Sequence, residues 1–436
     1  MNRGLNAQQS GLATRRHAAK CLAQCLGGAP FNPFTPEQIP DGRDRAFANR
    51  LVSLALRRHG HLDLIITDLM PKGLPKRSGS FGPLLRIALA ELLFDERDAD
   101  HAAIGVAGDL IKADRRGRHH QPLLNAVLRS AQRQRDRFRD LPEQSLFPDW
   151  LTKDWGRNYG ADSGQAFAAA MLSQPALDIS LKPPQTHLPD GLEGTEQLPG
   201  SFRLAARGRP VAQLPGYEDG DWWVQDVAAT LPARLVPTGE GTRVLDLCAA
   251  PGGKTAQLAA LGFDITALDN SGQRLLSLRA NMQRLGLKAR ILCEDALKYH
   301  PGEPFDHVLL DAPCSALGTF RRHPELIWQR TGPDIAGRAK LQREMLVAAA
   351  QMLKPGGALV FATCSLQREE GEYHLDAIAA GALPALRPDP VAPEELPGLE
   401  AAITTGGAVR TYPGLKCGAI PDGQMDGFFV ARFRRC

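Results

Sequence analysis

From about residue 222 onward, the chain alternates between short apolar segments and longer amphipathic stretches. This alternation is typical of strand–helix–strand units, which build a parallel sheet with helices on both faces. The pattern predicts strands at Val244–Cys248, Ile265–Asp269, Arg290–Cys293, His307–Asp311, Ala358–Cys364 and Phe428–Phe433. Sheets of this kind bind ligands at the carboxyl ends of their strands, so the residues that follow each strand are the first candidates for chemistry.

The first 140 residues have a different pattern, with apolar residues at helical spacing and breaks in the Pro- and Gly-containing segment 71–83. This predicts an all-α bundle of six or seven helices. Residues 141–180 predict two or three further helices, and the Pro- and Gly-rich stretch 182–220 predicts a linker or a small irregular α+β subdomain. A second such stretch, 381–425, predicts loops over the active face. We therefore expect three parts with the boundaries 1–142, 143–220 and 221–436.

The charge is distributed unevenly along the chain. Residues 1–150 hold 23 Lys and Arg against 16 Asp and Glu, whereas the remainder holds 29 against 32. A basic end joined to a slightly acidic body favours a polyanionic partner such as RNA or DNA for the first part. The residues that we expect to contact nucleic acid there are Arg115, Arg116, Arg118 and Arg129.

Composition excludes several classes of protein. With 43% hydrophobic and 23% charged residues, the chain is typical of globular proteins and not of disordered chains. No apolar run is long enough for a membrane helix, and the first twenty residues lack the apolar core of a secretory signal, so we expect a cytoplasmic protein. Eight cysteines without a CxxC pair, and scattered histidines, favour free thiols and no metal site.

The segment after the first predicted strand is rich in glycine but matches neither common phosphate-binding motif. It reads Cys248-Ala249-Ala250-Pro251-Gly252-Gly253-Lys254, and a Walker motif would need glycine at position 248. Three carboxylates, Asp246, Asp269 and Asp295, belong to the ends of three successive strands. Asp269 suits ribose hydroxyls and Asp295 an adenine amino group, which together favour an adenosine-bearing ligand without phosphates, S-adenosylmethionine.

Two cysteines, Cys314 and Cys364, belong to the ends of the fourth and fifth predicted strands. A thiolate beside a methyl donor is needed for methylation of a pyrimidine at ring carbon 5, because that carbon is a poor nucleophile. Addition of the thiolate at carbon 6 makes the ring enamine-like, which splits one difficult step into easier ones. A base must then remove the carbon-5 proton before the thiol leaves. Position alone does not say which of the two cysteines attacks.

At this point the motifs CAAPGGKT, ALDNS, DAPCSALGTFRRHPE, LKPGG, FATCS and DGFF resemble the Sun-type family of bacterial 16S rRNA cytosine-carbon-5 methyltransferases. The first 140 residues are similar to the NusB-like RNA-binding domain that these enzymes often carry. The resemblance implies an all-α NusB-like bundle and a Rossmann-like class I methyltransferase domain, with a small α+β linker subdomain between them. It also implies methylation of one cytosine of small-subunit ribosomal RNA through a covalent Cys364–pyrimidine adduct.

Site residues follow from the resemblance by position. Cys364 is implied to be the nucleophile, Cys314 to assist release of the product, and Asp311 to contact the cofactor and the target base. Residues Cys248 to Lys254, with Asp269 and Asp295, are implied to line S-adenosylmethionine. Gln225 and Asp226 match an element that shapes the cofactor site, and Arg321 and Arg322 match a substrate-facing loop that would contact RNA.

Two other interpretations stay open. A DNA cytosine methyltransferase would use Cys314 as its nucleophile, and a non-catalytic RNA-binding factor would keep the fold without turnover. The expected partner is small-subunit ribosomal RNA, with no membrane and no metal, and nothing in the sequence requires more than a monomer.

Overall fold

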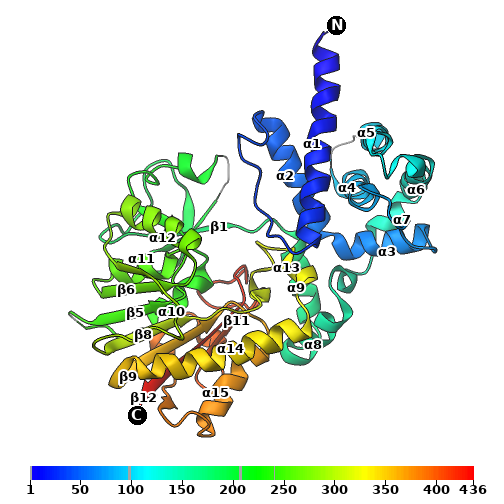
Figure 1. Ribbon diagram of the computed structural model, residues 1–436. Coiled ribbons are helices and arrows are strands. Elements are labelled where there is room, and N and C mark those ends of the chain that lie inside the picture. The colour runs from blue at the N-terminus through cyan, green and yellow to red at the C-terminus, as the bar shows by residue number, and fades with distance from the viewer. Residues whose placement is uncertain (1, 97–99, 206–208, 240) are drawn as a thin grey trace. The chain divides into compact units, whose positions relative to one another are not determined.

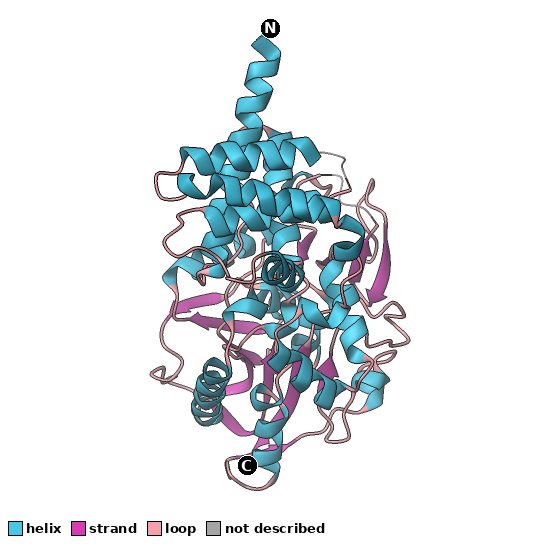
Figure 2. Cartoon of the chain, turned by 90° about the vertical axis from the view of Figure 1, so that its right-hand side faces the viewer, coloured by secondary structure: helices cyan, strands magenta, loops and turns pink. Residues whose placement is uncertain are grey.

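The computed structural model describes residues 2–96, 100–205, 209–239 and 241–436. The chain forms two compact units (Figures 1 and 2). The helical unit comprises residues 1–173 together with 322–329, and the sheet unit comprises residues 174–321 and 330–436. The boundaries 1–142, 143–220 and 221–436, which divide the chain into three functional domains, stay predictions. In the described part of the chain, no helix is long and apolar enough to cross a membrane.

The helical unit confirms the predicted all-α bundle. Its helices are α1 (Asn2–Leu26), α2 (Gly42–Arg57), α3 (His59–Leu69), α4 (Phe81–Phe94), α5 (Asp100–Ala113), η1 (Arg118–His120), α6 (Gln121–Arg133), α7 (Arg135–Arg139), η2 (Glu143–Leu146), α8 (Asp149–Tyr159), α9 (Ser163–Leu172) and α13 (Leu326–Gln329). Helix α4 is apolar nearly all round, and eleven of its residues are buried, because it packs in the centre of the bundle. Within it, buried Glu91 accepts a hydrogen bond of 2.7 Å from Arg15 Nε of α1.

The sheet unit holds one large sheet in the order β10-β12-β9-β8-β5-β6-β7, with β11 paired to β12. Its strands are β5 (Arg243–Leu247), β6 (Asp264–Asp269), β7 (Arg290–Cys293), β8 (Phe305–Asp311), β9 (Leu353–Thr363), β10 (Leu386–Pro388), β11 (Val409–Thr411) and β12 (Phe428–Arg435). Strands β5 to β9 are parallel, as predicted.

The expectation of a wholly parallel sheet is wrong at one edge, where β12 runs antiparallel to β9. Six of the eight residues of β12 are buried, so its apolar run is compatible with either direction of pairing. The short strand β11 also pairs antiparallel with β12, over Val409–Thr411. The stretch 381–425, predicted as loops, thus supplies the short strands β10 and β11.

Helices cover both faces of the large sheet, as predicted. Alternate residues of β5 belong to different cores, Val244 to one and Leu245 to the other, as the pleat requires. The helices of this unit are η3 (Val211–Gln213), η4 (Val227–Thr230), α10 (Leu231–Arg234), α11 (Gly253–Ala260), α12 (Gly272–Leu285), η5 (Leu317–Thr319), α14 (Gly332–Gln351), η6 (Arg368–Glu370), α15 (Glu372–Ala379), η7 (Pro393–Glu395) and η8 (Glu400–Ala402). Residues of α10, α11 and α12 share the core of Val244, whereas residues of α14 and α15 share that of Leu245.

A second, small antiparallel sheet precedes the large one in the chain. Its strands are β1 (Leu177–Leu181), β2 (Gly194–Leu198), β3 (Ser201–Leu204) and β4 (Trp222–Val224), in the order β2-β3-β1-β4. This sheet has its own apolar cluster, in which Trp222 is fully buried. Strands β2 and β3 lie in the small α+β region predicted at 182–220. Strand β1 lies almost wholly in 141–180, where helices were predicted, so that prediction is wrong for the last residues of the segment.

Candidate active site

The parallel order of β9, β8, β5, β6 and β7 brings the predicted site residues to one edge of the sheet. Neighbouring strands run in the same direction, so their carboxyl ends meet at that edge. Cys364 directly follows β9, Cys314 follows β8, the glycine-rich loop follows β5, Asp269 ends β6 and Asp295 follows β7. The contacts described next show which of these residues meet.

The two strand-end thiols meet directly. Cys314 Sγ and Cys364 Sγ lie 3.4 Å apart, and both residues are partly buried. The hydrogen bond with Cys364, together with burial, holds the pKa of Cys314 well above its usual range. Burial therefore favours the neutral form of Cys314, and the contact allows one sulfur to donate a hydrogen bond to the other.

Beside the thiols lies an ion pair between Lys254 of α11 and Asp311 at the end of β8. Lys254 Nζ donates to Asp311 Oδ2 at 2.8 Å and lies 5.2 Å from the ring centre of Phe428. Burial lowers the pKa of Lys254, but the charge and hydrogen bond of Asp311, together with the charges of Cys364 and Asp246, outweigh it, so the net pKa is raised. Lys254 is therefore a fixed cation, and Asp311 keeps 30% of its side chain exposed toward ligands.

The glycine-rich loop between β5 and α11 follows a tight path over the strand ends. Cys248 has φ +61° and Gly252 has φ +104°, both in the left-handed region. A Cβ on Gly252 would lie 2.9 Å from Leu278 Cγ, so only glycine fits there without a shift. The loop is held by the N–H of Ala250, which donates to Asp269 Oδ2 at 3.2 Å. Burial raises the pKa of Cys248, which makes it a neutral lining thiol.

The three predicted cofactor carboxylates differ in their surroundings. Asp269 is 2% exposed and lies 3.3 Å from Arg274 Nη1. Asp295 accepts a hydrogen bond of 3.0 Å from the N–H of Leu297 and thereby also caps a turn. Asp246 is fully buried beneath the loop and accepts a 2.6 Å bond from Thr255, while its Oδ1 has no partner among the described residues.

These observations fit the site to S-adenosylmethionine. A partly exposed carboxylate, Asp311, can face the ammonium group, and a buried carboxylate that ends the second parallel strand, Asp269, suits ribose hydroxyls. Backbone amides of the glycine-rich loop lie at the same edge, and Cys248 lines it with a soft, neutral sulfur. No group of three potential metal ligands occurs in the described ranges.

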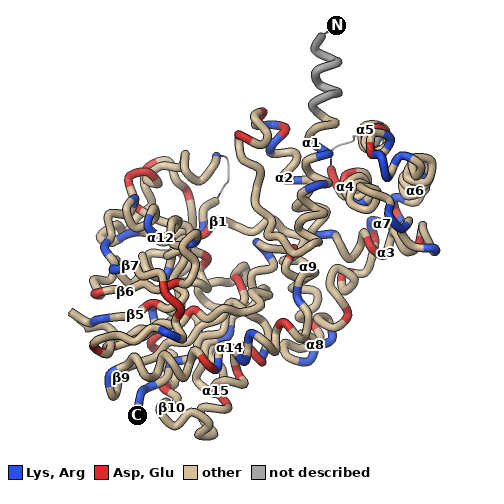
Figure 3. Tube along the Cα trace, viewed as in Figure 1, with Lys and Arg blue, Asp and Glu red and all other residues tan. Residues whose placement is uncertain are grey.

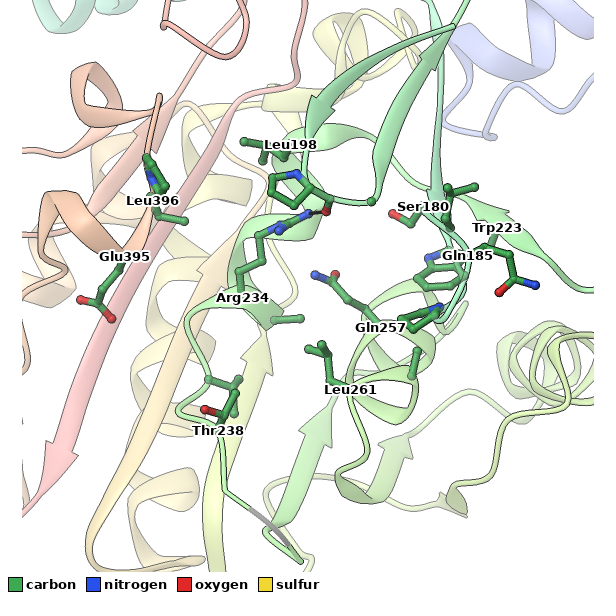
Figure 4. A pocket seen from close by; sticks show the side chains of 18 residues that line it. Ser180, Gln185, Leu198, Trp223, Arg234, Thr238, Gln257, Leu261, Glu395 and Leu396 are labelled. Atoms are coloured by element: carbon green, nitrogen blue, oxygen red, sulfur yellow. Dashed lines mark hydrogen bonds between the residues drawn. The ribbon is translucent and has the colours of Figure 1, made fainter. Parts of the chain in front are cut away.

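The element Gln225-Asp226 has two structural roles. Gln225 Oε1 accepts from Ser180 Oγ at 2.9 Å and from Trp223 Nε1 at 2.7 Å, and its Nε2 donates to Gln257 Oε1 of α11 at 3.1 Å. Ser180, Trp223 and Gln257 line a cavity of about 400 Å³ (Figure 4), whose lining contains none of the predicted catalytic residues. Gln225 therefore supports α11, the helix that the cofactor loop enters, from the side of the small sheet.

The prediction that Arg321 contacts RNA requires a correction. Its side chain is 3% exposed, and it pairs with Asp226 at 3.1 Å and with Asp426 at 3.2 Å. A guanidinium buried between two carboxylates does not contact RNA, so Arg321 holds the motif segment in place instead. Arg322 is exposed and begins the segment 322–329, which belongs to the helical unit. In that segment Gln329 Nε2 donates to the carbonyl of Cys25 at 2.8 Å.

The predicted RNA-binding residues of the helical unit lie at its surface. Arg115, Arg116, Arg118 and Arg129, hereafter the basic loop surface, are exposed, and the described residues provide no carboxylate partner for their guanidinium groups. Figure 3 shows basic positions gathered where α5 is followed by α6. Three arginines further along are engaged with protein groups instead, namely Arg135, Arg137 and Arg139.

Comparisons with known proteins agree with this geometry. Residues 233–434 match the family described as 16S rRNA methyltransferase RsmB/F, and residues 12–133 match the NusB family. The chain is 34% identical to ribosomal RNA small subunit methyltransferase B of Sodalis glossinidius, over 95% of this chain and 96% of that protein. It is 35% identical to the protein of the same name from Vibrio cholerae, over 83% and 88%.

Two solved structures share the fold. The protein PH0851 has a TM-score of 0.75 over 97% of this chain and 99% of its own, at 23% identity. A methyltransferase homologue from Pyrococcus horikoshii has a TM-score of 0.55 over 66% of this chain and 96% of its own, at 26% identity. The chain belongs to the 16S rRNA methyltransferase RsmB/F family, whose members are S-adenosylmethionine-dependent enzymes, and it carries a NusB family domain.

Proposed function

We propose that this enzyme methylates carbon 5 of one cytosine in small-subunit ribosomal RNA, with Cys364 as its nucleophile. The observation that carries the proposal is the pair of thiols, 3.4 Å apart at the ends of two adjacent parallel strands. A second thiol so close to the first gives the site one group for attack and one for release. The Lys254–Asp311 ion pair lies at the same strand ends and supplies charges for the base and the cofactor.

In the first half of the reaction, the Cys364 thiolate adds to carbon 6 of the cytosine. A carbon–sulfur bond forms, and the electron pair of the C5=C6 double bond moves to make carbon 5 nucleophilic. S-Adenosylmethionine, when bound, supplies the electrophilic methyl group that carbon 5 acquires. The residues that we assign to holding it are those of the loop 248–254 with Asp269, Asp295 and Asp311. Lys254, as a fixed cation, can stabilise negative charge that develops on the ring.

In the second half, water acting as the base takes the proton from carbon 5, and the double bond re-forms. The electron pair of the C5–H bond becomes the new C5=C6 bond, and the carbon–sulfur bond breaks to return a thiolate to Cys364. We assign Cys314 to assist this release, because its sulfur lies beside that of Cys364. A Cys314-first mechanism, as in the DNA methyltransferase alternative, would need a thiolate where the pKa of Cys314 is held high.

For RNA recognition we assign the basic loop surface and Arg322. Exposed guanidinium groups can contact phosphates, and such contacts offset the few kcal/mol that base extrusion costs. Ribosomal RNA as the substrate supports a cytoplasmic enzyme, and the two cysteines, Lys254 and Asp311 that we assign to the reaction all belong to one copy of the chain. Action as a monomer therefore remains our expectation.

The test is transfer of labelled methyl from S-adenosylmethionine to an unmodified 16S rRNA transcript, followed by nuclease digestion and identification of the product nucleoside. We expect label in 5-methylcytidine with the wild type, and none with Cys364→Ala. Cys314→Ala should instead accumulate a denaturant-stable protein–RNA adduct. Cys436→Ala, which removes an exposed thiol outside the site, is the matched control.

The outcomes separate the alternatives. Product formation that survives Cys364→Ala but not Cys314→Ala would reverse the assignment of the nucleophile, and methylation of DNA in place of RNA would favour the other enzyme class. Cofactor and RNA binding without any transfer to the transcript or to a small-subunit particle would indicate a binding factor.

A further inference from the structure

A buried carboxylate lies between the two segments that carry the thiols, and the reaction above gives it no role. Glu370, the last residue of η6, is fully buried. The N–H of Ser315 donates to its Oε1 at 2.8 Å, and the hydroxyls of Ser315 and Ser365 each donate to its Oε2 at 2.5 Å. Gln342 Nε2 adds a fourth donor at 3.3 Å from Oε1.

These contacts tie the two thiol segments to one another. Ser315 directly follows Cys314 and Ser365 directly follows Cys364, and the two serine hydroxyl oxygens lie 3.0 Å apart. The four groups that donate to Glu370 are all neutral. Burial of a charge costs free energy unless hydrogen bonds compensate it. Here the hydrogen bonds to the Glu370 carboxylate come from the segments beside the two thiols and from Gln342.

Gln342 extends the same network toward the β8 loop. Its Nε2 also donates to the carbonyl of Pro313 at 2.9 Å, and its Oε1 lies 3.0 Å from Nε2 of buried His374. Burial lowers the pKa of His374 to about 4, so its ring is neutral and donates to that oxygen. The donors around Glu370 are thus neutral. Through the bonds to Ser315 and Pro313, Glu370 and Gln342 hold the loop segment that contains Cys314.

The two thiols do not depend equally on this network. Cys364 directly follows β9, whose last residue Thr363 is paired with β12, and its carbonyl accepts from the N–H of Gly318 at 2.9 Å. Cys314 lies in the loop after β8, outside the sheet. The next residue but one, Ala316, has φ +58°, a conformation that a non-glycine residue adopts only when its surroundings impose it. The place of Cys314 therefore depends more on Glu370.

We propose that Glu370 is a positioning residue that sets where Cys314 lies relative to the Cys364 adduct, so that its contribution falls on the release half of the reaction. This inference rests on the proposed function. After Cys364 has bonded to carbon 6, the proton still has to leave carbon 5 and the carbon–sulfur bond still has to break. Cleavage of the carbon–sulfur bond needs Cys314 beside an adduct that the strand β9 already holds.

The experiment uses the full chain, S-adenosylmethionine and the unmodified 16S rRNA transcript in single-turnover mixing. It measures adduct formation and product release separately. Glu370→Gln keeps the shape of the side chain but replaces the shared acceptor Oε2 by an amide. We expect adduct formation within about threefold of the wild type and release slowed by roughly 10- to 100-fold, the scale of a misplacement of about 1 Å. The adduct should accumulate.

Two further variants make the result specific. Ser315→Ala removes the hydroxyl on the Cys314 side and should slow release in the same way, whereas Ser365→Ala on the Cys364 side should affect release less. Glu369→Gln is the matched control, because it makes the same chemical change at the neighbouring, partly exposed residue. Thermal unfolding of each variant is measured alongside, since a shift in melting alone would not change the ratio of release to adduct formation.

Three results would overturn the proposal. In the first, the ratio of the release rate to the rate of adduct formation is the same in Glu370→Gln as in Glu369→Gln. In the second, Glu370→Gln slows adduct formation and release equally. In the third, Glu370→Gln does not fold and Ser315→Ala releases product at the normal rate. Failure of the proposed function is a different result, in which the wild type itself yields no 5-methylcytidine or no adduct.

Discussion

Asp246 is the buried group with the clearest consequence for stability. It lies in β5 beneath the cofactor loop with no exposed surface, and only its Oδ2 has a hydrogen-bond partner in the described chain, the Thr255 hydroxyl. Burial, which outweighs the Thr255 bond, raises the pKa of Asp246 from 3.8 to about 7. The charges of Asp311 and Asp269 act in the same direction. The native state therefore holds a proton here that the unfolded chain releases.

The sign and size of the effect follow from this pKa. A group whose pKa is raised on folding contributes stability that is present below its unfolded pKa of 3.8 and is lost as pH rises through about 7. Each pKa unit corresponds to about 1.4 kcal/mol, so the whole loss is about 4 kcal/mol. Asp246→Asn mimics the protonated form and does not titrate. The variant should gain about 3 kcal/mol relative to the wild type between pH 5 and pH 8.

The assay is urea-dependent hydrogen exchange of peptides that cover β5 and α11, which reports the unfolding free energy of the sheet unit alone. Asp264→Asn changes an exposed aspartate at the start of β6 and should show the same gap to the wild type at both pH values. Because the comparison is between variant and wild type at each pH, other titrating groups cancel. The reasoning would be refuted if the unfolding free energy of Asp246→Asn, relative to the wild type, stays constant or decreases as the pH rises.

Three further predictions concern other parts of the chain. Substituting alanine at all four positions of the basic loop surface should weaken RNA binding and leave cofactor binding unchanged. The slope of log K against log salt concentration should become shallower by about three, as measured by filter binding at several salt concentrations. Arg321→Ala removes the guanidinium group that pairs with buried Asp226 and Asp426 and should cost about 3–5 kcal/mol in the same exchange assay. A milder loss would mean that water reaches the two carboxylates. Burial lowers the pKa of His374 to about 4, so the stability that this residue contributes is lost as the pH falls from 6.5 toward 4. On that acidification the free energy of unfolding should decrease by about 3 kcal/mol less in His374→Gln than in the wild type.

The parallel strands could be predicted because their signal is local. Each strand from β5 to β9 is an apolar run that ends at a polar or glycine-rich turn, and such runs need no knowledge of their partners. The direction of β12 could not be predicted in this way. Its run is buried on both faces, and only the distant pairing with β11 and β9 decides the direction.

Within the site, residues with a local sequence signal could be predicted, and a residue whose role depends on distant contacts could not. Cys314, Cys364, Asp311 and the loop 248–254 follow strand ends, so their shared edge follows from strand order alone. Glu370 gives no such signal, because its contacts with Ser315 span 55 residues. A serine after each of two strand-end cysteines was the available clue. It becomes meaningful only when a buried acceptor is known to lie between the serines.

Charge runs illustrate why exposure cannot be inferred from composition. Arg135 Nη2 and Arg139 Nε donate to the carbonyls of Leu92 and Leu93 at 2.9 Å, in the last turn of α4, where helix carbonyls lack partners within the helix. These arginines cap the central helix of the bundle, so their loss should lower the stability of the helical unit and leave the salt dependence of RNA binding nearly unchanged. The basic loop surface, which precedes these two arginines in the chain, has no such role among the described residues. One run of arginines thus divides into a part that stabilises the fold and a part available to phosphate, and only the second part should follow salt.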